Sequence, residues 1–117
     1  MNLDLLNDTY RTFMKTELNK LAKFLKEKRT LAGLSQKDVA TSLGYSTSQF
    51  ISNWERGISQ PPIHTLRKLA KMYAVSPDQM FQVLLSATID QVQIELKEKF
   101  YGTEDKDAAP RVQLVAN

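Results

Sequence analysis

The stretch "LSQKDVATSLGYSTSQFISNWERG", residues 34–57, contains two short helical patterns separated by a tight turn. Ser35 is a suitable N-cap for the first helix, and Asp38 follows three residues later, as in a capping box. Gly44 ends that helix, and Gly57 ends a second one over residues 48–56. Two short helices joined in this way form a helix-turn-helix, so this stretch predicts the fold.

The flanking segments continue the same helical spacing of apolar residues. Upstream, apolar residues recur in steps of three and four from Leu3 to Leu31, with a candidate break at Thr16. Downstream, one helix follows the prolines with "IHTLRKLAKMY", and another starts at "SPDQMF" and runs to about Phe100. Alternation with a period of two is confined to "RVQLV", residues 111–115, a candidate strand. The fold class is therefore predicted to be all-α.

Further start signals refine these boundaries. Ser46 or Thr47 is placed to cap the second helix of the helix-turn-helix. A proline in the first turn opens the helix over residues 63–73. Ser76 as N-cap with Pro77 at the first position opens the last helix.

Composition limits the function classes. The 117 residues are 42% hydrophobic and 25% charged, which is typical of one soluble globular domain. There is no cysteine, which excludes disulfides, thiolate metal sites and cysteine nucleophiles. His64 is the single histidine and has neither metal-ligand partners nor a nucleophile nearby in sequence. We expect no enzyme activity, no metal and no cofactor.

The charges of this chain are distributed unevenly along the sequence. Residues 1–75 hold 12 Lys and Arg against 6 Asp and Glu, whereas residues 76–117 hold 4 against 7. The basic front half favours nucleic acid as a partner, although a solvated Lys-rich surface has the same composition.

The start "MNLDLLNDTY" lacks a basic n-region, and the longest nearly uncharged apolar stretch, residues 80–89, is too short for a bilayer. We expect a cytoplasmic protein, nucleoid-associated when bound to DNA and with no membrane partner.

Three segments in order carry a family resemblance: "LKEKRTLAGLSQKDVATSLGYS", "ISNWERG" and "QPPIHTLRKLAKMYAVSPDQMF". Together they resemble the Cro/repressor-type family of helix-turn-helix proteins, also called the xenobiotic-response-element (XRE) family, over roughly Leu21 to Phe81. The resemblance implies a lambda-repressor-like five-helix DNA-binding domain. One departure is an additional residue between Gly44 and Gly57, located in the turn "GYSTS". Positions from Gln49 onward therefore correspond to the family more securely than those before it.

Helix 48–56 is expected to read DNA with its polar face. Phe50, Ile51 and Trp54 share one face, which predicts docking onto the core, with Phe50 at the edge of that face. By family position, the opposite face is implied to read bases in the major groove through Ser48, Gln49, Ser52 and Asn53. Gln and Asn pair bidentately with adenine, and no Lys or Arg stands among these positions to read guanine. We therefore predict A·T pairs at the contacted positions.

The resemblance also implies phosphate contacts and one structural ion pair. In the family, a glutamine that opens the helix before the turn binds a backbone phosphate, and the loop after the recognition helix lies beside the DNA. The corresponding candidates here are Gln36, Lys37, Thr47, Arg56, Ser59, Gln60 and His64. Arg29 and Glu55 match a partly buried ion pair. The lysines at positions 20, 23, 26 and 28 either add to this basic surface or only solvate their helix.

Four regions are expected: an N-terminal helical extension (1–19), the helix-turn-helix DNA-binding domain (20–81), a C-terminal dimerisation helix (82–101) and a flexible tail (102–117). Leu85, Ile89, Val92, Leu96 and Phe100 form a stripe close to a coiled-coil seam. Its partner is either a second copy, giving a homodimer through 82–101, or residues 3–14 of the same chain, and 1–19 is a further candidate for the dimer interface.

The leading hypothesis is a sequence-specific double-stranded-DNA-binding transcriptional repressor that acts as a homodimer. One alternative is an antitoxin or antirepressor-type protein-interaction module on the same fold. A second alternative is a nucleoid-type DNA binder of low specificity.

Overall fold

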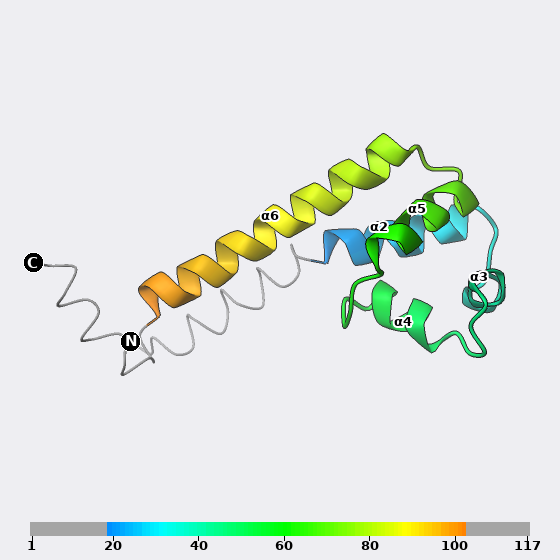
Figure 1. Cartoon of the computed structure of the whole chain (residues 1–117), viewed down its shortest axis with the longest axis horizontal. Helices are drawn as coiled ribbons and strands as arrows, with labels where there is room; N and C mark the ends of the chain where they lie inside the picture. Colours follow the sequence, from blue (N-terminus) through cyan, green and yellow to red (C-terminus); the bar gives the residue numbers. More distant parts are fainter. Residues whose placement is uncertain (1–18, 103–117) are drawn as a thin grey trace, which may run out of the picture.

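The computed structural model describes residues 19–102, and every regular element in that range is helical (Figure 1). The helices are α2 (Lys20–Leu31), α3 (Gln36–Leu43), α4 (Gln49–Glu55), α5 (Ile63–Met72) and α6 (Pro77–Tyr101). The predicted all-α class is confirmed. The expected helix before residue 19, the break at Thr16, the candidate strand at 111–115 and the flexible tail beyond residue 102 lie outside the described residues.

Two helices begin with the side-chain caps that the sequence predicts. The Ser35 hydroxyl accepts a hydrogen bond from the Asp38 backbone N–H at 2.9 Å, and the Asp38 carboxylate accepts one from the Ser35 N–H at 2.9 Å. The hydrogen bond from the Ser35 backbone N–H, followed by the interaction with the Ser35 side chain, lowers the pKa of the Asp38 carboxyl. Ser76 caps α6 by accepting from the Gln79 N–H at 3.1 Å. The start of α5 differs from its prediction, because Pro62 stands at the N-cap position and Ile63 is the first helical residue.

Helices α2 to α5 all end in the same hydrogen-bonding pattern. After α3, the Gly44 N–H donates to Thr41 O and the Tyr45 N–H donates to Ala40 O, which is a Schellman motif. The equivalent pairs of bonds close the other three helices at Gly33, Gly57 and Ala74, and each closing residue has a positive φ. Ala74 is the single non-glycine residue with positive φ among residues 19–102. In each case the next residue is apolar: Leu34, Tyr45, Ile58 and Val75.

One hydrophobic core joins these helices. The largest fully buried side chains come from four helices and are Leu25, Val39, Ile51 and Leu69. Helix α2 packs against α4 and α6, α3 packs against α4, and α5 packs against α6. In the apolar patterns of α2 and α5, Leu31 and Ile63 are not buried: Leu31 is 72% exposed and Ile63 is 67% exposed. Leu31 is the last residue of α2 and lies about 120° around the helix from Leu25, outside the core-facing side, while Ile63 stands at the open first turn of α5.

Helix α6 belongs to the core through its first half and extends well beyond the other helices (Figure 1). Met80 is buried in the core, and Val83, Leu84 and Ala87 pack against the same core. Large apolar residues on another face of α6 are exposed: Phe81, Leu85, Ile89, Val92, Leu96 and Phe100, here called the α6 row. Ile94 is buried without belonging to the core cluster. Within residues 19–102, no helix combines the length and the apolar character needed to cross a bilayer.

Candidate nucleic-acid interface

Helix α4 is anchored to the core by two apolar side chains. Ile51 and Trp54 are buried, as their spacing predicts, and Phe50 at the edge of this face is 53% exposed. The opposite face is open to solvent: Gln49 is exposed, and Ser48, Ser52 and Asn53 are partly exposed. The structure thus brings the four candidate base-reading residues together on one polar surface.

A buried ion pair ties α4 to α2. The Arg29 Nε donates to Glu55 Oε2 at 2.6 Å and its Nη2 donates to Glu55 Oε1 at 3.0 Å. The two side chains are 12% and 3% exposed, respectively. The hydrogen bond to Glu55 raises the pKa of Arg29, and the negative charge of Glu55 adds to this against the opposing effect of burial. This is the pair that the family resemblance implies, and it fixes the C-terminal end of α4.

Gln36 connects the same carboxylate to α3. Its Nε2 donates to Glu55 Oε1 at 3.0 Å, so Glu55 accepts from both flanking helices. Gln36 is the first residue of α3, and its amide retains a second hydrogen for a phosphate. This bond could not be predicted from the sequence, because nothing in the spacing of residues 36 and 55 indicates that their side chains meet.

On the polar face of α4, Gln49 and Asn53 are already hydrogen-bonded to each other. Gln49 Nε2 donates to Asn53 Oδ1 at 2.9 Å, one helical turn apart. This orientation leaves Gln49 Oε1 as an acceptor and Asn53 Nδ2 as a donor for a partner. Adenine presents the complementary pair in the major groove, the N6 donor and the N7 acceptor.

The turn before α4 differs from its prediction. Ser48, not Ser46 or Thr47, stands at the N-cap position, and it makes no side-chain cap bond. Thr47 instead accepts from the Gln49 N–H through its hydroxyl at 3.3 Å. The reason is the longer turn, which leaves room for a serine/threonine turn ahead of the first helical residue.

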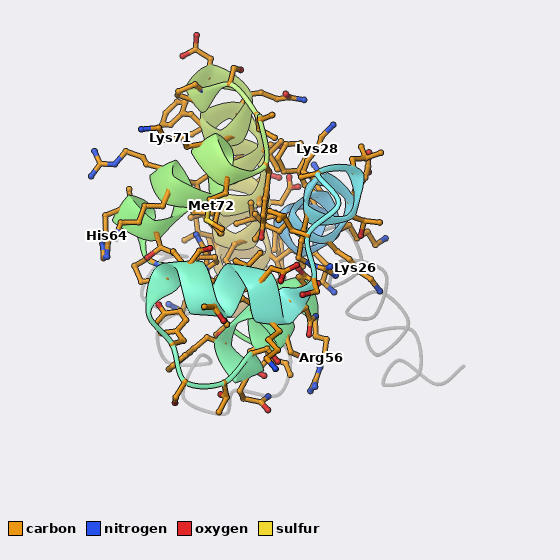
Figure 2. All side chains as sticks on the ribbon, turned by 90° about the vertical axis from the view of Figure 1, so that its right-hand side faces the viewer. Lys26, Lys28, Arg56, His64, Lys71 and Met72 are labelled. Carbon is orange, nitrogen blue, oxygen red and sulfur yellow. The ribbon has the colours of Figure 1, made fainter. Side chains whose placement is uncertain are left out.

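The candidate phosphate-binding residues lie around α3 and α4. Lys37 and Thr47 are exposed on α3 and in the turn, and Arg56, Ser59 and Gln60 are exposed where α4 leads into the loop before α5. His64 is exposed in the first turn of α5. Figure 2 shows His64 and Arg56 on opposite sides of the view, with α3 and α4 between them.

Of the lysines at positions 20, 23, 26 and 28, Lys28 lies away from the candidate interface, whereas Lys26 lies on the same side of the view as Arg56 (Figure 2). Lys28 and Lys71 lie at the end of the view opposite Arg56 (Figure 2), and the Lys28 ammonium stands 5.5 Å above the Phe24 ring. Lys20 pairs with Asp90 at 2.6 Å and donates to Ser86 at 3.1 Å. These local partners favour a structural role for Lys20 and Lys28. Within the described residues no cluster of His, Asp and Glu is placed to hold a metal ion.

An aromatic cluster joins Tyr45 in the turn to Phe50 and Trp54 of α4, and it was not predicted from the sequence. The Tyr45 ring lies 4.9 Å from the Phe50 ring and 6.1 Å from the Trp54 ring, centroid to centroid. The signal that could have revealed it is the position of Tyr45 directly after Gly44, where a Schellman motif places an apolar residue against its helix.

Comparison with known proteins agrees with this geometry. Residues 25–80 match a family model described as helix-turn-helix. The chain is 36% identical over 89 residues to the HTH-type transcriptional regulator ImmR of Bacillus subtilis (strain 168), covering 68% of this chain and 69% of that protein. No solved structure matches at a significant level. With a helix-turn-helix in residues 36–55, an exposed polar face on α4 and these two matches, the chain belongs to the XRE-type helix-turn-helix family of transcriptional regulators.

Proposed function

We propose that this protein is a sequence-specific double-stranded-DNA-binding transcriptional repressor that reads the major groove with α4. The observation that carries the proposal is the hydrogen bond between Gln49 and Asn53 on a helix whose opposite face is anchored in the core. Ile51, Trp54 and the Arg29–Glu55 pair fix the backbone of α4, and the bond between the two amides leaves one acceptor and one donor available on the same face. Such an arrangement suits adenine. Repression then follows by occupying the operator.

The residues around α4 supply the sequence-independent part of the affinity. We expect phosphate contacts from Gln36 and Lys37 at the start of α3, from Thr47 in the turn, and from Arg56, Ser59, Gln60 and His64 between the end of α4 and the first turn of α5. Because His64 and Arg56 lie on opposite sides of α3 and α4, these contacts would fall on both edges of the groove (Figure 2). Phosphate contacts fix register and orientation, while base contacts supply sequence preference.

The test is a binding-site selection with the purified full chain, followed by binding of selected and random duplexes across salt concentrations. A specific regulator binds the selected duplex at least about 10³-fold more tightly. Gln49→Ala and Asn53→Ala should each reduce this ratio, with A·T pairs at the affected positions. The matched control Gln82→Ala, an exposed glutamine on α6, should leave the ratio unchanged. Guanine at the contacted positions, or equal binding of both duplexes, would contradict the proposal; the latter is what a protein-interaction module or a nucleoid-type binder predicts.

Arg56→Gln probes the phosphate contacts separately. Removing one phosphate contact should weaken selected and random duplexes by the same factor and reduce the slope of log affinity against log salt by about 1. A loss restricted to the selected duplex would assign Arg56 to base reading instead.

The α6 row supports a homodimer. Its six large apolar side chains span 20 residues of one helix, a ridge about 28 Å long that is exposed in the described protomer. The other candidate partner, residues 3–14, lies outside the described residues. Ile89→Asp should give a monomeric mass at micromolar concentration, whereas Lys97→Asp, on the same helix beside the row, should stay dimeric. A monomeric unmodified protein would contradict this part of the proposal.

A further inference from the structure

Phe50 has an unusual position for a large aromatic residue of the core face. It is 53% exposed, although its ring packs against Tyr45 at 4.9 Å and lies 6.4 Å from Trp54. One side of the ring is therefore braced by protein, and the remainder faces solvent. Aromatic pairs of this kind hold a fixed mutual geometry, so the exposed edge of Phe50 is held in place.

The exposed edge lies beside the base-reading amides. Successive residues of a helix are 100° apart, which puts Phe50 about 60° around α4 from Asn53 and 100° from Gln49. It also lies in the first turn of α4, and the N-terminal residues of a recognition helix are those that contact base edges. Phe50 thus borders the Gln49–Asn53 pair on its apolar flank.

The major groove offers one apolar group that such a side chain can recognise, the 5-methyl group of thymine. Thymine is abundant where adenine is read, because every A·T pair carries one. An intercalating wedge requires a side chain on an element that can enter the base stack, whereas Phe50 is braced on a helix fixed by Ile51 and Trp54. Contact with the edge of a base pair requires no insertion into the stack, so it fits a fixed Phe50 better than intercalation does.

We propose that Phe50, positioned by Tyr45, contacts a thymine methyl next to the base pair read by Gln49 and Asn53 and so determines specificity at that position. This inference rests on the proposed function, since it requires a selected operator. The alternative is a purely structural role, in which Phe50 only covers Tyr45 and Trp54. Single exposed apolar residues are common on protein surfaces.

Replacing thymine by deoxyuridine tests the proposal, because the substitution removes only the methyl group. In the selected operator, each thymine is exchanged singly, and binding is measured for the unmodified protein and Phe50→Ala. The unmodified protein should lose about three- to fivefold at one or two positions, the effect of one buried methyl-sized group. Phe50→Ala should lose a similar factor on the thymine operator and become indifferent to deoxyuridine at those positions.

Two further variants keep the outcome decisive. Phe50→Leu retains an apolar contact and should retain part of the deoxyuridine effect, even if Phe50→Ala proves poorly folded by circular dichroism. Leu31→Ala removes an exposed apolar residue at the far end of α2 and should leave the effect intact. Equal deoxyuridine sensitivity with and without Phe50, or no sensitive thymine, would overturn the inference while leaving the proposed function standing. Failure to select any operator would overturn both.

Discussion

Replacing Arg29 by methionine tests how α4 is held against α2. The substitution keeps an unbranched apolar stem but shortens the side chain and removes all its donors. Three hydrogen bonds are lost: two to Glu55, at 2.6 and 3.0 Å, and one from Nη1 to the Leu34 carbonyl at 2.8 Å. Glu55, whose side chain is 3% exposed, retains only the bond from Gln36.

The expected loss follows from this burial. Removing one partner of a buried ion pair destabilises a protein by about 3–5 kcal/mol, because the remaining charge stays buried without its partner. The surviving bond from Gln36 places Arg29→Met at the lower end, about 3 kcal/mol. Domain stabilities are about 5–15 kcal/mol, so the variant should still fold but unfold at much lower denaturant concentration.

Urea unfolding followed by tryptophan fluorescence measures this loss, since Trp54 is the sole tryptophan and is buried. The matched control is Lys20→Met, which breaks an ion pair of the same 2.6 Å length whose side chains are 39% and 26% exposed. Partly exposed pairs contribute less than buried ones, so this control should lose about 1 kcal/mol, clearly less than Arg29→Met. The double variant Arg29→Met/Glu55→Leu should recover much of the loss, because no buried charge remains. Equal losses from Arg29→Met and Lys20→Met would refute the reasoning.

Three further predictions concern stability. Burial, and then the charge of Glu55, raise the pKa of Tyr73, so the folded protein keeps the phenol protonated while the unfolded chain ionises near pH 10. Stability should therefore fall as the pH rises above about 10, and Tyr73→Phe should flatten that fall in urea titrations at several alkaline pH values. Ser35→Ala removes the N-cap of α3 and should lower the unfolding free energy by about 1 kcal/mol, whereas an unchanged midpoint would argue against the capping box. Ala74→Gly should raise stability by about 0.5–1 kcal/mol, because Ala74 has φ +56°, while Gly44→Ala, with φ +83°, should lower it by a similar amount in thermal melts.

The sequence alone predicts most of this fold because its helix boundaries carry local signals. Ser35, Gly44 and Gly57 act through bonds to residues a few positions away, and the spacing of Ile51 and Trp54 determines the buried face of α4. The end of α5 at Ala74 carries no such signal, because alanine rarely adopts a positive φ. Its closure depends instead on the following Val75, which is buried in the core.

The candidate interface could be predicted only in outline. Helical periodicity places Gln49 and Asn53 opposite Ile51, but their mutual hydrogen bond depends on side-chain rotamers. The bond from Gln36 to Glu55 depends on how α3 crosses α4, and the exposure of Phe50 depends on Tyr45 occupying the adjacent surface. These are tertiary facts that residue spacing does not contain.

Because α6 is long, a small tilt of this helix moves its far end by several ångströms. The core holds the helix through Met80, Val83, Leu84 and Ala87, and the Lys20–Asp90 pair braces it one turn further on. The 14 residues of α6 beyond Ala87 are about 21 Å long, so a tilt of about 9° displaces the far end by about 3 Å. That is close to the spacing of adjacent base pairs, about 3.4 Å. In a dimer joined along α6, a surface lysine that touches no DNA would thus help to set the distance between the two half-sites.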